Sequence, residues 1–390
     1  MVIARWSVAR GETVVIALLS LFMTGALALT SAQSVDGSAK SARRQLDLSQ
    51  PLTIAWRYET DLILNLTPAF DTERVYLPLA GGTIVSLKAE NGQLNWRSEM
   101  GGELSASPAA DDLRVYVASE TGKSGDGGRR ATGALRALGR EGGVTQWMRT
   151  LAMPLRGSLT LSEGRLFAGS DDGKVYAFAA NTGELAWTYD YGSPFNGQPV
   201  LGDGHVYLGS EDGNLLSLDA TSGKLLWRFK TKGPVRGPVA HHRGFVFFGS
   251  GDAYVYAVNA QTGKLLWRKR TGAAVLSVVR TGEELLAASL DNFVYKFSAT
   301  GARVWKRQLP GRISSQPLLA GEGALFTPLS SANGVVLEVR DGRQVNSLPA
   351  GDEITTSASA IAVGDTVLLT SKNGLLAFRQ PRDASSGLKK

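Results

Sequence analysis

The chain of 390 residues contains no cysteine and only three histidines. Without cysteine no disulfide can form, so the folded state must rest on packing alone. His205 lies inside a strand-like pattern, while His241 and His242 sit together at a predicted turn, so the three lack the spacing of a zinc site. No serine stands in a Gly-x-Ser-x-Gly elbow that leads into a helical pattern. We therefore expect no catalytic residues and no metal site.

Sustained helical periodicity is also missing, because apolar residues inside the chain's repeats do not recur at spacings of three and four. The chain carries 42 Lys and Arg against 35 Asp and Glu, a formal net charge of +7. This mild excess forms no basic helix and no interleaving of aromatic and basic residues, the pattern expected of a nucleic-acid face. We expect an all-β protein that does not bind nucleic acid.

Tryptophan, in contrast, recurs in a regular pattern. Six tryptophans each follow a glycine by four positions, and three of the five steps between them are 40 residues long. The pairs are Gly92 and Trp96, Gly143 and Trp147, Gly183 and Trp187, Gly223 and Trp227, Gly263 and Trp267, and Gly301 and Trp305. A fixed period of this length indicates one supersecondary unit that is copied many times.

Each copy has the pattern of four short antiparallel strands. Between Gly204 and Trp227, two apolar runs flank Asp212-Gly213, a strong hairpin signal, and a second turn leads into a third strand that carries the tryptophan. A further short apolar run precedes each set. Four antiparallel strands every ~40 residues are typical of a β-propeller blade.

The count predicts eight blades within residues 51–380. A seventh, degenerate unit has Asn346 in the tryptophan position, and an eighth, Ser357 to Phe378, ends before its fourth strand. The lone strand Leu52 to Tyr58, which contains Trp56, has no blade in front of it. We expect this N-terminal strand to complete the last blade and close the ring, because closure removes exposed sheet edges.

We interpret the periodic glycines and tryptophans as structural. Glycine supplies the positive φ of a tight turn, and a buried indole covers apolar surface between neighbouring blades. The indole N–H needs an acceptor, which a turn carbonyl can supply. The predicted docking residues are Trp56, Trp96, Trp147, Trp187, Trp227, Trp267 and Trp305 with Gly92, Gly183, Gly223 and Gly263.

The repeat resembles the tryptophan-docking repeat of pyrroloquinoline-quinone-type (PQQ-like) propellers. The residues that carry the resemblance are 177–187, 217–227 and 257–267, and it extends over about residues 51 to 380. It is weaker at 137–147 and weakest after Trp305. Tryptophan is never followed by aspartate, so the repeat is not of the WD type.

Two subfamilies with this repeat imply different functions. Quinoprotein alcohol dehydrogenases hold the quinone and a calcium ion on the axis, typically beside a disulfide between adjacent cysteines. Outer-membrane assembly factors of the BamB kind are similar in length to this chain and act as non-catalytic scaffolds. Because the chain has no cysteine, the resemblance favours a scaffold without cofactor that assists outer-membrane β-barrel assembly. A PQQ-binding redox protein with Ca²⁺ and an envelope ligand sensor remain alternatives.

The N-terminus has the features of a targeting segment. Arg5 and Arg10 precede an apolar stretch from Val14 to Leu29, so residues 1–32 are predicted to be a signal peptide or a membrane anchor. We expect residues 33–50 to be a flexible linker and 381–390 a disordered tail. The propeller would then be periplasmic or anchored at the outer face of the inner membrane. Assembly factors of the BamB kind are usually lipoproteins, and this chain lacks the cysteine that carries the lipid.

The predicted contact surface is the rim where the chain enters each innermost strand. Arg156 and Arg236 recur at the same place in two repeats and would put positive charge at the channel mouth. The stretch Met153 to Gly157 resembles the Leu-x-Leu-Arg-Gly stretch of the assembly factors, which implies contact with the periplasmic domains of the barrel insertase. The hypothesis is a partner-binding patch of Leu155, Arg156 and Arg236 on a monomer within a complex. We interpret the Gly-rich insertion 121–132 as a longer blade hairpin.

Overall fold

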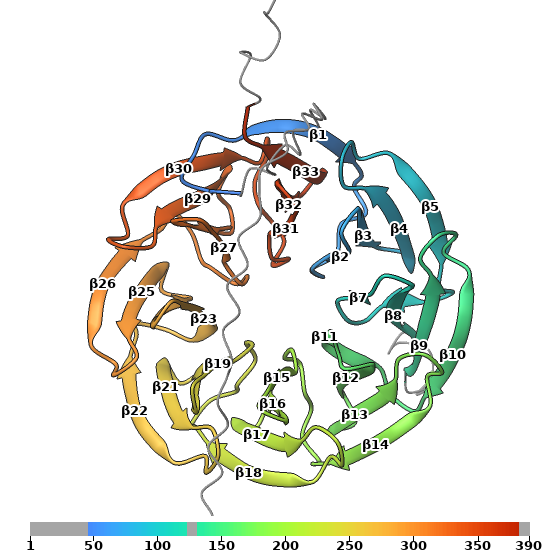
Figure 1. The fold of residues 1–390 in the computed structure, drawn as a ribbon, viewed down its shortest axis with the longest axis horizontal. Coiled ribbons are helices and arrows are strands. Elements are labelled where there is room, and N and C mark those ends of the chain that lie inside the picture. The colour runs from blue at the N-terminus through green and yellow to red at the C-terminus, as the bar shows by residue number, and fades with distance from the viewer. Residues whose placement is uncertain (1–45, 123–130, 382–390) are drawn as a thin grey trace, which may run out of the picture. The chain divides into compact units, whose positions relative to one another are not determined.

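The computed structural model describes residues 46–122 and 131–381, which belong to one compact unit. Its regular structure consists of strands arranged in eight antiparallel sheets around a common axis (Figure 1). The prediction of an all-β, eight-bladed propeller is confirmed. Among the described residues no helix is long and apolar enough to span a membrane.

The first four blades follow one another along the chain. Blade 1 contains β2 (Ala69–Phe70), β3 (Arg74–Leu79), β4 (Thr83–Lys88) and β5 (Leu94–Glu99). Blade 2 contains β6 (Glu103–Leu104), β7 (Ala109–Ala110), β8 (Arg114–Thr121), β9 (Thr132–Gly139) and β10 (Thr145–Leu151). Blade 3 contains β11 (Leu155–Ser162), β12 (Arg165–Ser170), β13 (Lys174–Ala179) and β14 (Leu185–Asp190). Blade 4 contains β15 (Val200–Gly202), β16 (His205–Gly209), β17 (Asn214–Asp219) and β18 (Leu225–Lys230).

The other four blades complete the circle. Blade 5 contains β19 (Ala240–His242), β20 (Phe245–Gly249), β21 (Tyr254–Asn259) and β22 (Leu265–Arg270). Blade 6 contains β23 (Val275–Thr281), β24 (Glu284–Ser289), β25 (Phe293–Ser298) and β26 (Arg303–Gln308). Blade 7 contains β27 (Leu318–Ala320), β28 (Gly323–Phe326), β29 (Asn333–Glu338) and β30 (Gln344–Pro349). Blade 8 contains β31 (Ile361–Val363), β32 (Thr366–Ser371), β33 (Gly374–Arg379) and β1 (Thr53–Glu59).

Blade 8 combines the two ends of the propeller. Strand β1 pairs antiparallel with β33, from Thr53 opposite Arg379 to Glu59 opposite Gly374. It occupies the outer position that the fourth strand has in the other blades (Figure 1). The first strand therefore pairs with the last one and completes a four-stranded sheet with β31 and β32, as the lone N-terminal strand pattern predicts.

The core lies between the blades. Each cluster of buried side chains takes members from two adjacent sheets, as Phe167 and Val175 of blade 3 do with Val206 and Leu216 of blade 4. Strands in the middle of a blade are apolar on both faces because each face packs on a neighbouring blade. Blade stacking thus provides the hydrophobic stabilisation of the ring.

The tryptophans join each blade to the next. In blade 3, the Trp187 indole Nε1–H donates to the Ala220 carbonyl of blade 4 at 3.0 Å, and the ring covers Gly223. The same bond recurs around the ring. The donors and acceptors are Trp56 to Ala89, Trp96 to Arg140, Trp147 to Ala180, Trp227 to Ala260, Trp267 to Ala299 and Trp305 to Val339, at 2.7–3.2 Å.

The junction between blades 7 and 8 is built differently. Asn346 replaces tryptophan, and its Nδ2 donates to the carbonyls of Leu48 and Gln50 at 3.2 and 2.7 Å. The Leu48 N–H donates to the Ala320 carbonyl at 3.2 Å, and the side chains of Leu46 and Leu48 are buried. Residues 46–50, predicted as the end of a flexible linker, therefore belong to the folded ring, because their leucines cover the gap left by the missing indole.

Other predicted segments lie wholly or partly outside the described residues. These are the targeting segment 1–32, linker residues 33–45 and tail residues 382–390. In the insertion, Thr121 at the end of β8 pairs with Thr132 at the start of β9, so the hairpin between them is longer than in other blades. Residues 123–130 of this hairpin are not described.

Candidate functional site

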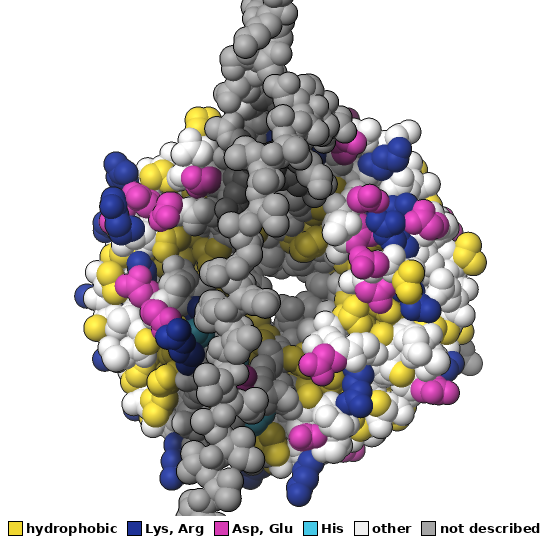
Figure 2. All heavy atoms as spheres, viewed as in Figure 1, with side chains coloured by type: hydrophobic (Ala, Val, Ile, Leu, Met, Phe, Trp, Pro, Cys, Tyr) yellow, Lys and Arg dark blue, Asp and Glu magenta, His cyan; other side chains and the backbone are white. Residues whose placement is uncertain are grey.

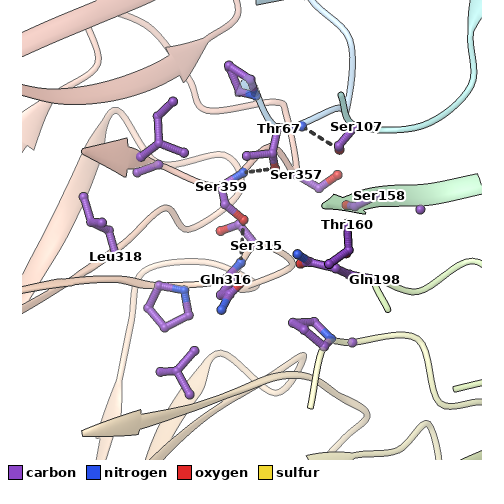
Figure 3. A pocket seen from close by; sticks show the side chains of 18 of the residues that line it. Thr67, Ser107, Ser158, Thr160, Gln198, Ser315, Gln316, Leu318, Ser357 and Ser359 are labelled. Carbon is purple, nitrogen blue, oxygen red and sulfur yellow. Dashed lines mark hydrogen bonds between the residues drawn. The ribbon is translucent and has the colours of Figure 1, made fainter. Parts of the chain in front are cut away.

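A cavity of about 1020 Å³ lies on the axis of the ring. It opens at the centre of the face seen in Figure 2. The segments that lead into the innermost strands line it, as expected from the repeat. The lining includes Thr67, Ser107, Ser158, Thr160, Gln198, Ser315, Gln316, Ser357 and Ser359 (Figure 3). Alanine, proline, valine and leucine residues lie between them, so the cavity wall combines neutral polar and apolar groups and carries few charges.

Hydroxyl groups of this wall connect neighbouring blades (Figure 3). Thr67 N–H donates to Ser107 Oγ at 3.0 Å, and Ser359 N–H donates to Thr67 Oγ1 at 3.0 Å. Gln316 N–H in turn donates to Ser359 Oγ at 2.9 Å. These hydroxyls satisfy backbone groups at the ends of short inner strands, where the sheet ladder supplies no partner. These hydroxyl groups therefore join neighbouring blades.

The cavity wall does not fit the cofactor of the redox alternative. Calcium takes oxygen ligands, of which carboxylates are the principal charged ones. The residues that line the cavity include Arg236, Arg280 and His241 but no Asp or Glu. Elsewhere in the described part of the chain, no group of three or more His, Asp or Glu side chains could hold a metal ion. We therefore derive no reaction through a quinone and calcium.

Leu155, a member of the predicted partner-binding patch, lies in the core. Its side chain is 1% exposed and packs in the cluster that contains Ala106, Leu135 and Leu166. The first residue of β11 faces the neighbouring blade because inward and outward positions alternate along a strand. Leu155 positions the strand and cannot contact a partner directly.

Arg156, the next residue, bridges two blades at the rim. Its Nη2 donates to Glu120 of blade 2 and its Nε donates to Asp171 of blade 3, both at 2.7 Å. Its side chain is 27% exposed. Burial acts to lower the pKa of Arg156, but the bonds to Glu120 and Asp171 outweigh it and raise that pKa. Two carboxylates thus compensate the positive charge that the sequence predicts here.

Arg236 occupies the equivalent position two blades further on. It binds Glu211 of blade 4 in a bidentate fork, Nε to Oε1 at 2.8 Å and Nη2 to Oε2 at 2.6 Å. This bond is the main cause that lowers the pKa of Glu211, with a contribution from Asn196. The Arg236 side chain is 53% exposed, and its Nη1 makes no hydrogen bond to the described residues. Of the three predicted residues, Arg236 is the most accessible.

Three acidic residues of the rim were not predicted to belong to the partner-binding patch: Glu120, Asp171 and Glu211. Asp171 and Glu211 follow Ser170 and Ser210 at the same place in consecutive repeats, in the turn between the second and third strands. Alignment of the repeats would have revealed the shared acidic position. The pairing with an arginine of the preceding or following loop depends on how adjacent blades pack, and no local pattern predicts it.

Comparisons with known proteins agree with this fold. The model of the family described as outer membrane protein assembly factor BamB matches residues 44–130, 131–236 and 212–387. BamB of Shewanella oneidensis is 29% identical over 116 residues, which are 28% of this chain and 27% of that protein. BamB of Burkholderia pseudomallei is 30% identical over 124 residues, 31% of this chain and 28% of that protein. The alignments thus span less than a third of either relative.

Solved structures show the same fold at low sequence identity. BamB from Moraxella catarrhalis has a TM-score of 0.70 and 16% identity, with 85% of this chain and 98% of that chain covered. The quinohemoprotein alcohol dehydrogenase of Comamonas testosteroni has a TM-score of 0.69 and 11% identity, with 87% and 78% covered. The structural likeness alone does not separate the two. Because the family model covers nearly the whole ring, this chain belongs to the outer membrane protein assembly factor BamB family.

Proposed function

We propose that this chain is a non-catalytic scaffold of the cell envelope that assists the assembly of outer-membrane β-barrel proteins. The observation that carries the proposal is the match of the BamB family model along the ring. The carboxylate-free wall of the axial cavity supports a role without quinone and calcium. In this proposal the chain is exported and acts as one subunit of a complex with the barrel insertase.

The partner surface in this proposal is the rim belt, defined as Glu120, Arg156, Asp171, Glu211 and Arg236. The two ion-paired groups hold the loops of blades 2–3 and 4–5 in place, so the surface is preorganised for binding. The Nη1 donors of the half-exposed Arg236 guanidinium make no hydrogen bond within the described part of the chain, so they can bind a carbonyl or carboxylate of the partner. Arginines of this kind are frequent hot spots in protein interfaces.

In-cell photo-crosslinking tests the proposal. A photoreactive amino acid at position 196, beside Glu211, is expected to capture the barrel insertase, which mass spectrometry identifies. The matched control is position 144, because Val144 is 71% exposed and lies in the turn before β10, at the opposite end of its blade. We expect Arg236→Ala to reduce capture from position 196 roughly tenfold. Equal capture from both positions, or none from 196 in a folded and exported chain, would contradict the proposal.

A further inference from the structure

Three neighbouring outer strands carry positive charge and no negative charge. They are β18 with the sequence LLWRFK, β22 with LLWRKR and β26 with RVWKRQ. The cations are Arg228, Lys230, Arg268, Lys269, Arg270, Arg303, Lys306 and Arg307. We call this surface of blades 4 to 6 the basic wall. In Figure 2, dark blue side chains project from the left and lower margins of the ring, where Figure 1 places these strands.

The other five outer strands are neutral in sum. Strand β1 has Arg57 and Glu59, β5 has Arg97 and Glu99, and β30 has no charged residue. Strands β10 and β14 contribute one arginine and one aspartate, respectively. Charged side chains on an outer strand protect its open edge from pairing with another chain. Five strands achieve this without a net charge, so edge protection does not explain eight cations on the other three.

Few of these cations are neutralised within the described part of the chain. Lys230 pairs with Asp212 at 3.6 Å. Lys306 lies over the Phe293 ring at 3.6 Å, Arg268 lies 5.0 Å from the centre of the Tyr254 ring, and Arg307 donates to backbone carbonyls. Apart from the ion pair of Lys230, these contacts orient the side chains and leave their charge uncompensated. The wall therefore attracts anions.

Exposed apolar side chains precede the tryptophan on these strands, and most of the cations follow it. Leu226, Leu265, Leu266 and Val304 are 44–48% exposed and lie on the same three strands. A combination of basic and exposed apolar side chains is typical of surfaces that lie at a membrane interface, where the cations meet headgroups and the apolar groups enter the acyl boundary. Strands β5, β10 and β14 also expose apolar side chains, namely Leu94, Met148 and Leu185, but each carries at most one cation. Among the outer strands, the basic wall alone combines both features, and a membrane interface uses both, whereas an acidic protein partner would use the charge alone.

We propose that the basic wall docks the propeller edge-on against an anionic membrane surface. Adjacent blades of an eight-membered ring are turned by about 45°, so β22 makes the contact while β18 and β26 recede from the plane. Attraction to anionic headgroups extends over a Debye length of about 8 Å at physiological salt, so the flanking strands still contribute. This proposal concerns a different surface from the rim belt and holds independently of it.

A single fluorescent label tests the contact. The full chain has no cysteine, so Leu266→Cys and Leu94→Cys each create one labelling site, on the basic wall and on the neutral strand β5. With vesicles of equal phosphatidylcholine and phosphatidylglycerol, an environment-sensitive dye at 266 is expected to shift to the blue, and high salt is expected to reverse the shift. Vesicles of phosphatidylcholine alone are expected to leave its emission unchanged. A dye at 94 is expected to stay unchanged with both vesicles, although the N-terminal segment is present in every sample.

Charge reversal provides a second readout. Neither Arg228 nor Arg270 makes a hydrogen bond or ion pair with the described residues, so Arg228→Glu with Arg270→Glu is expected to leave the fold intact, which circular dichroism checks. This pair is expected to weaken the salt-sensitive dye response at 266 at least tenfold, whereas Arg57→Glu with Arg97→Glu, an equal charge change, alters it less than about twofold. Equal responses from the two pairs would overturn the proposal. A shift produced by polyglutamate and not by anionic vesicles would assign the wall to an acidic protein instead.

Discussion

A contact between one tryptophan and one glycine recurs at seven of the eight blade junctions. The indole of one blade donates to a turn carbonyl of the next and lies flat on the glycine four positions before the next outer-strand tryptophan or Asn346. Each contact combines a large buried apolar area with a satisfied N–H group. Glycine is required at this position for two reasons. Its φ is positive, and the indole occupies the space that a Cβ atom would need.

The first prediction separates these two requirements. Gly223 has a φ of 71°, and an added Cβ would lie 2.5 Å from Trp187 Cε3. Gly204 has a φ of 78° but no atom within 4 Å of such a Cβ. We expect Gly204→Ala to lower the free energy of unfolding by about 1 kcal/mol through backbone strain alone. Gly223→Ala is expected to lose a further 1–3 kcal/mol, roughly, from overpacking against the indole.

Urea unfolding followed by tryptophan fluorescence measures both variants. Equal losses of stability in Gly223→Ala and Gly204→Ala would show that the Trp187 indole moves away from the added Cβ atom without lowering the free energy of unfolding. The tryptophan contact would then not contribute to holding blades 3 and 4 together.

At the level of the element, the ring is completed by two segments from the N-terminal side of the propeller. Strand β1 supplies the outer strand of blade 8, and residues 46–50 cover the junction of blades 7 and 8. At that junction Asn346 holds the carbonyls of Leu48 and Gln50, so a chain segment takes the place of an indole. The indole at seven junctions and the segment 46–50 at the eighth both fill an apolar gap between adjacent blades.

The second prediction tests this segment. Leu48 is fully buried in the cluster with Leu325, Val336 and Leu348. Leu48→Ala is expected to lower the free energy of unfolding by about 2–5 kcal/mol, the range for a buried leucine that leaves a cavity. Leu94→Ala, with the same atoms removed from a side chain that is 48% exposed, is expected to change it by roughly 0.5 kcal/mol or less. Similar midpoints for both variants in urea would mean that residues 46–50 do not contribute to the fold.

At the level of the whole molecule, the ring surrounds a cavity whose wall combines hydroxyl and amide groups with apolar side chains. The repeat brings the same segment of each blade to the axis, so the wall gains many similar polar groups and few charged ones. The charged groups lie instead at the rim, in ion pairs between blades, and on the outer wall. The binding surfaces that we propose therefore lie at the rim, around the mouth of the cavity, and on the outer strands of the ring.

The third prediction concerns the cavity. Titration of the purified chain with pyrroloquinoline quinone and Ca²⁺ is expected to leave the absorbance spectrum of the quinone unchanged, because the wall offers no carboxylate for the ion. Dye reduction with alcohols is expected to stay at background. An apo quinoprotein alcohol dehydrogenase treated in the same way is the positive control. A saturable spectral change in this chain would contradict the scaffold proposal and revive the redox alternative.

Much of the fold followed from the sequence because its signals are local. A hairpin such as the one around Asp212-Gly213 depends on adjacent residues, and so does the short, mostly apolar run of a strand such as 214–219. The repeat period then determines the number of blades, and Asn346 marks the one that departs from the pattern. The candidate rim was also predictable in outline, since Arg156 and Arg236 recur at one position of the repeat.

The roles of these same rim residues were decided by tertiary structure. Leu155 is buried by strands of its neighbours, and the charge of Arg156 is compensated by carboxylates 15 and 36 residues away. Leu48 reaches a junction built from residues nearly 300 positions later. The sequence determined the repeating unit and the number of copies, because hydrogen-bonded turns and strand alternation are short-range. Burial and charge pairing at the rim arose only from the packing of blade on blade, because they depend on which distant side chains meet.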